Sequence, residues 1–117
     1  MPSYVLIMEN RMDRTLKIGK NLKIDFKKGY YYYVGSAKRI SRIKRHFQLN
    51  KSLRWHIDYI TVVFDVIGAV ILKLNECELA KILSRGLKGI KGFGCSDCKC
   101  ETHLFYSTNL TLEFLPT

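Results

Sequence analysis

Residues 29–35 of the chain read GYYYYVG, and this stretch decides the fold. Tyrosine favours half-buried positions on a pleated sheet, so four tyrosines between two glycines predict a β-strand. Successive side chains of a strand point to opposite faces. We therefore expect Tyr31 and Tyr33 on one face of a sheet, and Tyr30 and Tyr32 on the other.

The next segment, residues 36–49, is strongly basic and reads SAKRISRIKRHFQL. Its apolar residues recur at helical spacing, which predicts a helix capped by Ser36 and running to about Leu49. Three apolar residues make up the expected buried side of this helix: Ile40, Ile43 and Phe47.

Arg42 and His46 lie four residues apart in this segment, so a helix presents them on one face. Tyr33, near the end of the preceding strand, adds a phenol. A fixed cation, a titratable ring and a hydroxyl together suit chemistry on a phosphodiester. A solvated basic helix after a buried strand explains the same residues equally well, and Arg42 is then only a surface cation.

The segments before the tyrosine strand predict further β-structure. Residues 3–8 (SYVLIM) are apolar and predict a first strand. Residues 16–26 alternate between apolar and polar on both sides of Gly19-Lys20-Asn21, which predicts a hairpin. This hairpin is inserted between the first strand and the tyrosine strand.

A second helix is expected to begin at Ser52 or Arg54 and to pass through the sequence WHIDY at residues 55–59. On it, His56 and Asp58 either line a cleft or form a buried hydrogen-bonded pair that supports the core.

The remainder of the chain predicts a strand, a helix and a short tail. The aliphatic run of residues 65–74 (DVIGAVILKL) predicts a central strand. Asn75 and Glu78 form the pattern of a capping box, at the start of a helix that ends near Gly86. Two more short strands are expected at residues 103–106 and 110–114. The order of elements predicts an α+β fold, with a small, mainly antiparallel sheet flanked by helices.

The composition limits the classes of function. A length of 117 residues with 47% hydrophobic residues fits one domain, residues 1–117. The net charge of +10 attracts polyanions, of which nucleic acid is the first candidate, although a high charge density is also typical of thermophile proteins. The basic residues expected to contact nucleic acid are Lys38, Arg39, Lys44, Arg45 and His56.

Membrane association is not expected. The most apolar segment, residues 57–74, is broken by Asp58, Asp65, Gly68 and Lys73, so no uninterrupted apolar run approaches the length of a membrane span. The basic helix also has a poor apolar face for binding a membrane surface. The N-terminus lacks the pattern of a signal peptide, so we expect a soluble, cytoplasmic protein.

Several segments resemble the GIY-YIG nuclease superfamily, and more closely its branch known as domain of unknown function 123. The matching pieces occur in order over nearly the whole chain: GYYYYVGSA, WHIDY, ECE, FGCSDC and HLFY. The second tripeptide of the superfamily stands here as Tyr33-Val34-Gly35. Of the first tripeptide only Tyr4 remains, and residues 9–28 are inserted between the two strands. The late asparagine of the superfamily has no clear counterpart, although Asp97 lies in that region.

The resemblance implies an endonuclease that hydrolyses nucleic-acid phosphodiesters, DNA more than RNA, with one Mg²⁺ or Mn²⁺ ion. It implies Glu76 as the metal ligand and Arg42 as a clamp on a phosphate oxygen. Tyr4 or Tyr33 would orient or deprotonate the attacking water, which for a base role requires cations that lower the phenol pKa. His46 would relay a proton or hold a tyrosine hydroxyl. Glu76 also fits a purely structural role at the positive end of a helix.

Cysteine residues gather near the end of the chain. Cys95, Cys98, Cys100 and His103 fall within nine residues and include the soft ligands that tetrahedral zinc prefers. A packed loop with reduced thiols, or a disulfide to Cys77, explains the same residues.

We therefore rank three functions. The first is a metal-dependent endonuclease that reads the shape of its substrate in repair or recombination. The second is a non-catalytic module that binds nucleic acid, in which residues 30–33 stack single-stranded bases; the loss of most of the first tripeptide favours it. The third is an accessory domain that binds zinc or a partner protein through the tail. The oligomeric state is not predicted.

Overall fold

The computed structural model describes residues 2–93 and 102–115. Its main sheet has five antiparallel strands in the order β5-β1-β4-β7-β6. These strands are β1 (Ser3–Asn10), β4 (Gly29–Ser36), β5 (Asp65–Leu72), β6 (Lys88–Gly89) and β7 (Leu104–Ser107). A separate hairpin consists of β2 (Arg14–Ile18) and β3 (Leu22–Phe26). The helices are α1 (Ile40–His46), α2 (His56–Thr61) and α3 (Glu76–Gly86). The expected α+β fold with its inserted hairpin is confirmed.

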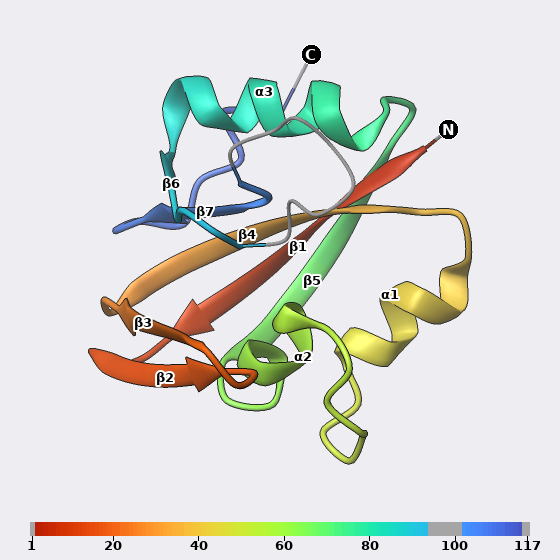
Figure 1. The fold of residues 1–117 in the computed structure, drawn as a ribbon. Coiled ribbons are helices and arrows are strands. Elements are labelled where there is room, and N and C mark those ends of the chain that lie inside the picture. The colour runs from red at the N-terminus through yellow and green to blue at the C-terminus, as the bar shows by residue number, and fades with distance from the viewer. Residues whose placement is uncertain (1, 94–101, 116–117) are drawn as a thin grey trace.

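The sheet separates two hydrophobic cores. On one face, Ile43 of α1, Ile57 and Ile60 of α2 and the hairpin residues Ile18 and Phe26 are buried together. On the other face, α3 buries Leu79, Ala80 and Leu83 against the sheet. Figure 1 shows this arrangement, with α3 on one side of the sheet and α1, α2 and the hairpin on the other. No helix among the described residues is long and apolar enough to span a membrane.

The tyrosine strand lies inside the sheet as β4, between β1 and β7. Its side chains alternate as predicted, because Tyr31 and Tyr33 pack in the core below α1 and α2, whereas Tyr30 and Tyr32 pack in the core below α3. Tyr31 and Tyr32 are almost completely buried. Burial on both faces explains why this strand carries aromatic residues without alternation of polarity.

Helix α1 is shorter than the sequence predicted. Ser36 does not cap it, because Ser36 pairs with Ser3 as the last residue of β4. The helix begins only after Arg39, whose side chain makes no capping hydrogen bond. Its buried residues are Ile43 and His46, whereas Ile40 and Phe47 are exposed. The buried stripe thus includes the histidine instead of the two outer apolar residues.

Strand β5 is an edge strand and not the central strand that the sequence predicted. It pairs only with β1 among the described strands. Val66 and Ala69 pack on one core and Val70 and Leu72 on the other, so a run of aliphatic residues serves both faces. Two large apolar side chains remain exposed on this edge, Ile67 and Ile71.

The helix starting at Asn75 is confirmed. Asn75 Oδ1 accepts a hydrogen bond from the Glu78 backbone N–H at 2.8 Å, and Asn75 Nδ2 donates to Glu78 Oε1 at 3.0 Å. The strand predicted at residues 110–114 is wrong. That segment is held by side chains instead, because the Thr111 N–H donates to Tyr32 Oη and Phe114 packs edge-on against the Tyr32 ring.

Candidate functional site

A cavity of about 370 Å³ lies beside the ends of β1 and β4, next to α1, the start of α2 and the first turn of α3. Five residues with predicted catalytic roles line it: Tyr4, Tyr33, Arg42, His46 and Glu76. The register of the sheet explains part of this arrangement, because Tyr4 of β1 pairs with Gly35 of β4 and so lies next to Tyr33. Segments distant in the sequence therefore bring a phenol, a guanidinium, an imidazole and a carboxylate to one cavity.

Tyr4 and His46 form the polar centre of the cavity wall. The Tyr4 hydroxyl and His46 Nε2 are joined by a hydrogen bond of 2.6 Å. Each residue is only 1% exposed, and the Tyr33 ring lies beside both, with its centroid 6.4 Å from that of Tyr4 and 6.0 Å from that of His46. The hydrogen bond lets a proton move between the phenol and the imidazole without crossing water.

Burial makes both partners neutral. It raises the pKa of the Tyr4 phenol above its ordinary value, and the neighbouring Tyr33 adds to the rise. Arg42 lowers the pKa of Tyr4, but less than burial raises it. Burial, with the positive charge of Lys51, lowers the pKa of His46 to about 4. The pair is thus a protonated phenol beside a neutral imidazole near pH 7, and not a phenolate stabilised by cations.

The burial of His46 predicts a specific loss of stability in mild acid. The unfolded chain protonates this imidazole below its ordinary pKa of about 6.5, whereas the folded chain keeps it neutral until the pH nears 4. Between pH 7 and pH 5, His46 should therefore remove about 2 kcal/mol from the free energy of unfolding. Urea unfolding of the wild type and His46→Gln at both pH values measures this difference, and the variant should lose correspondingly less.

Burial also lowers the pKa of His103. Because His103 is present in both the wild type and His46→Gln, its effect on the pH dependence of stability cancels in the comparison. The variant Gln48→Ala, which removes an exposed side chain that does not titrate, is the control and should lose as much stability as the wild type. An equal pH dependence of the wild type and His46→Gln would show that His46 does not remain neutral in the folded protein.

Arg42 is the exposed cation of the cavity. It lies on the same helix as His46, but the imidazole is buried whereas Arg42 is exposed. Its Cζ atom lies 5.4 Å from the centre of the Trp55 ring, in a cation–π contact. Arg54 adds a second positive side chain to the lining. Both guanidiniums suit a phosphate ligand.

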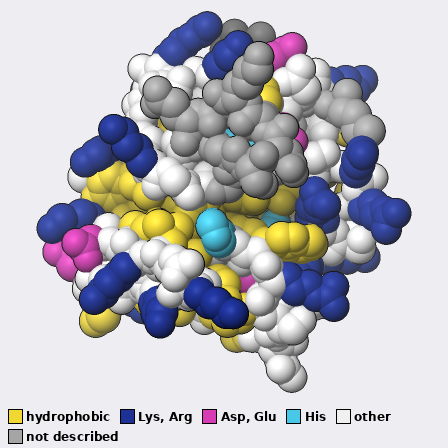
Figure 2. Space-filling model, in the orientation of Figure 1, with side chains coloured by type: hydrophobic (Ala, Val, Ile, Leu, Met, Phe, Trp, Pro, Cys, Tyr) yellow, Lys and Arg dark blue, Asp and Glu magenta, His cyan; other side chains and the backbone are white. Residues whose placement is uncertain are grey.

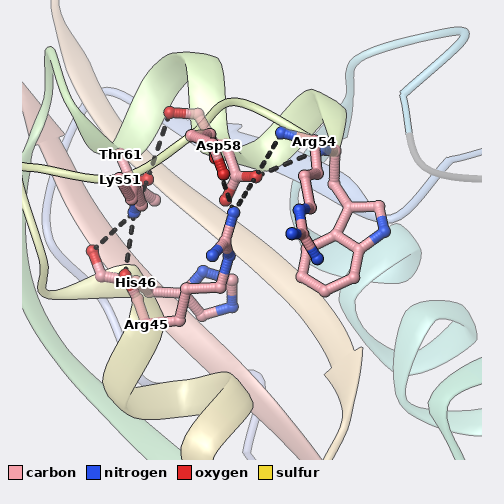
Figure 3. A network of polar contacts seen from close by, with 8 residues as sticks. Arg45, His46, Lys51, Arg54, Asp58 and Thr61 are labelled. Atoms are coloured by element: carbon pink, nitrogen blue, oxygen red, sulfur yellow. Dashed lines mark hydrogen bonds and ion pairs between the residues drawn. The ribbon is translucent and has the colours of Figure 1, made fainter.

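A polar network holds the end of α1 against the start of α2 (Figure 3). Asp58, with no exposed side-chain surface, accepts hydrogen bonds at one carboxylate oxygen from Arg45 Nη2, the Arg54 N–H and the Trp55 N–H, at 2.9–3.0 Å. Lys51 Nζ donates to the Arg45 carbonyl at 2.9 Å and to Thr61 Oγ1 at 2.6 Å. The network therefore holds the backbone at two residues that line the cavity, His46 and Trp55.

The network changes the interpretation of three predicted residues. Asp58 is buried and paired with Arg45, while His56 lines the cavity, so the two do not form the single unit considered from the sequence. Arg45 is only 22% exposed in its side chain and serves the network. The remaining basic residues predicted to contact nucleic acid are exposed and lie outside the cavity lining: Lys38, Arg39 and Lys44.

Glu76 reaches the cavity from the first turn of α3. Its side chain is 35% exposed, and its Oε2 lies 3.8 Å from His103 Nδ1. His103 is positioned by its backbone, whose carbonyl accepts a hydrogen bond from the Val34 N–H at 2.9 Å. A partly exposed carboxylate at a cavity is an oxygen donor of the kind that Mg²⁺ and Mn²⁺ prefer, so this residue fits the role of a metal ligand.

Two residues of the cavity lining were not predicted from the sequence to have a role. Trp55 and Arg54 belong to its lining, although only the adjacent His56 was predicted to contact a ligand. Their signal in the sequence was weak, because an aromatic and a basic residue before a short helix are common.

Three of the four residues in the zinc prediction, Cys95, Cys98 and Cys100, lie outside the described residues, and the fourth, His103, is buried. Within the described ranges 2–93 and 102–115, no group of three or more His, Cys, Asp or Glu side chains is placed to hold a metal ion.

Comparison with protein-family models matches residues 3–114 to the family described as domain of unknown function DUF123. No curated protein and no solved structure matches the chain. The family match covers almost the whole sequence, including every residue of the cavity described above.

Proposed function

The chain belongs to the DUF123 family, and we propose that it hydrolyses phosphodiester bonds in nucleic acid, preferentially DNA, at this cavity. The observation that carries the proposal is the presence of Tyr4, Arg42, His46 and Glu76 around one cavity. These residues come from three separate elements, and each supplies a group that the hydrolysis of a phosphate ester uses.

In this proposal, Arg42 binds an oxygen of the scissile phosphate through its planar fork of N–H donors. The Tyr4 oxygen accepts a proton from the attacking water as its own hydroxyl proton passes to His46 Nε2 along the 2.6 Å hydrogen bond. The negative charge of a bound phosphate favours the protonated imidazole, which offsets the effect of burial.

Glu76 would hold a Mg²⁺ or Mn²⁺ ion at the same cavity. Such an ion, when bound, stabilises negative charge on the phosphate and the departing oxygen. The positive charge of the protein, +10 over the whole chain, supports a polyanionic substrate and predicts binding that weakens as salt increases.

The proposal is tested with branched, flapped and single-stranded DNA in the presence of Mn²⁺ or Mg²⁺. The double variant Arg42→Ala, Glu76→Ala should cleave at least about 100-fold more slowly than the wild type, because it loses both the phosphate clamp and the metal ligand. The rate of strand cleavage on labelled substrates is the measurement.

The matched control is Arg85→Ala, Glu113→Ala, which removes the same two charges at exposed positions outside the cavity. It should cleave at the wild-type rate. If the wild type shows no more cleavage than the cavity variant, hydrolysis is excluded.

One observation supports a second candidate, a module that binds nucleic acid without cleaving it. In the free protein, Tyr4 and His46 together form only a weak general base, because burial raises the pKa of Tyr4 and lowers that of His46. Tight binding that is unaffected by Glu76→Ala and produces no cleavage would select this alternative.

A further inference from the structure

We infer that the cavity takes one unpaired nucleotide, whose base stacks against Trp55 and His56, so that the substrate is single-stranded at the position of the bound phosphate. This inference rests on the proposed function, because it assigns the rest of the same site. It names the substrate class from the side chains that the proposed hydrolysis does not use.

The size of the cavity is the first argument. At about 370 Å³ it falls within the range of pockets that enclose whole small molecules, about 300–1,000 Å³. A phosphate group held by Arg42 and Glu76 occupies only part of that space. The start of α2 and the residues just before it contribute four lining residues, Arg54, Trp55, His56 and Ile57, and we place the additional part of the ligand against the wall that they form.

That wall is aromatic. Trp55 is 45% exposed although it belongs to a cavity lining, and His56 is exposed beside it. The His56 ring lies against the buried Phe93, with 5.8 Å between ring centroids. In the face shown in Figure 2, a histidine side chain lies among hydrophobic side chains near the middle, and Lys and Arg side chains lie around them. Flat rings with an exposed face are the groups on which nucleobases stack.

The aromatic wall and the phosphate-binding cation are adjacent. The Cζ atom of Arg42 lies 5.4 Å from the centre of the Trp55 ring. The phosphate and the base of a single nucleotide can therefore contact Arg42 and the aromatic wall at the same time. The backbone of Trp55 is held by Asp58, which accepts a hydrogen bond from its N–H at 3.0 Å. The Cζ atom of Arg45 also lies 5.2 Å from the ring centre, so both the backbone and the ring have fixed contacts before a ligand arrives.

A base that stacks here cannot also be stacked and paired in a duplex, because both of its faces are then covered by neighbouring base pairs. The site therefore favours a single strand, a flap or a flipped nucleotide. Two of the four tyrosines of β4 are excluded as an alternative platform by their burial. Tyr31 and Tyr32 are 1% and 0% exposed, which makes the stacking predicted for residues 30–33 wrong for these two.

Trp55 provides its own probe, because it is the only tryptophan in the chain. Its fluorescence is measured while the protein is titrated, in EDTA so that no cleavage occurs, with a thymidine oligonucleotide. An abasic strand of the same length and the paired duplex are titrated in parallel. Binding of each is followed independently by the anisotropy of a label on the nucleic acid. The thymidine strand should quench the tryptophan at saturation, whereas the abasic strand should bind without quenching.

Variants extend the test to affinity. Trp55→Ala should weaken binding of the thymidine strand by about tenfold or more, with little effect on the abasic strand. Phe47→Ala is the matched control, since it removes an aromatic side chain of similar exposure, 48%, outside the cavity lining, and it should bind as the wild type does. His56→Ala leaves the Trp55 contacts with Asp58 and Arg42 in place. It should also weaken binding of the thymidine strand more than binding of the abasic strand.

The inference is overturned if the thymidine strand saturates the protein without changing the tryptophan fluorescence, or if the thymidine and abasic strands bind with equal affinity. Both readouts are independent of hydrolysis. Quenching without any metal-dependent cleavage would exclude the proposed enzymatic activity and retain the stacking site. Cleavage without quenching would retain the enzymatic activity and exclude the stacking site.

Discussion

Replacing Gly35 with alanine is expected to reduce the free energy of unfolding by about 3 kcal/mol and to abolish binding at the cavity. A Cβ atom at this position would overlap the Tyr4 ring at the Cζ, Oη and Cε1 atoms. Tyr4 is 1% exposed and its hydroxyl is bonded to His46, so the ring is held in place against Gly35. Any shift that relieves the overlap must break the bond between the phenol and the imidazole.

Gly68 provides the control, because it lies in strand β5 and a Cβ atom there would have no neighbour within 4 Å. Gly68→Ala should leave stability unchanged or raise it slightly, since glycine inside a strand is unfavourable. Urea unfolding measures both variants. The double variant Gly35→Ala, Tyr4→Leu should be no less stable than Tyr4→Leu alone, and an additive loss would contradict this explanation of the glycine.

Replacing Asp58 with alanine is expected to cost about 3–5 kcal/mol in the free energy of unfolding. The change leaves the partly buried Arg45 without its carboxylate and removes the acceptor for the N–H groups of Arg54 and Trp55. Burial raises the pKa of Asp58, but the hydrogen bonds from Arg45, Trp55 and Arg54 outweigh this effect and hold it below its usual value. This contribution is present above the ordinary pKa of about 3.9 and is lost as the pH falls further.

The exposed ion pair of Arg11 and Asp65 is the matched control. Its charged atoms are 2.6 Å apart, but the two side chains are 75% and 53% exposed. Asp65→Ala should therefore cost no more than about 1 kcal/mol. Equal losses for Asp58→Ala and Asp65→Ala in urea unfolding would contradict the structural role of the network.

The Asp58 variant should also disturb the cavity, because the network positions residues on both of its walls. His46 and Trp55 extend from the two segments that Asp58, Arg45 and Lys51 hold together (Figure 3). A shift in the emission of the single tryptophan at pH 7 would report this change in variants that remain folded. The Gly35 and Asp58 variants thus connect stability with the geometry of the site.

The elements of the fold were largely predictable because their signals are local. The alternation of residues 30–33, the turn in the inserted hairpin and the Asn75–Glu78 cap each depend on residues within a few positions of one another. Errors arose where tertiary packing overrides such signals. Ser36 has the character of a helix cap, but pairing with Ser3 extends β4 through it.

The same distinction explains which site residues could be foreseen. Arg42 and His46 share a short segment, so their proximity followed from helical spacing, yet that spacing did not predict that one is exposed and the other buried. Tyr4 and His46 are 42 positions apart, and their hydrogen bond depends on how β1 and α1 pack together. Trp55 had no pattern of its own, and only the tertiary structure places it in the cavity lining.

The amino-acid sequence by itself determined the order and type of most elements, the basic character of the molecule and the residue types available for chemistry on a phosphodiester. Only the tertiary structure decided that Tyr4, Arg42, His46, Trp55 and Glu76 line one cavity. It also decided that the phenol and imidazole are neutral. The physical reason is that strand and helix preferences act between near neighbours, whereas sheet register, burial and the resulting pKa values depend on contacts between segments far apart in the chain.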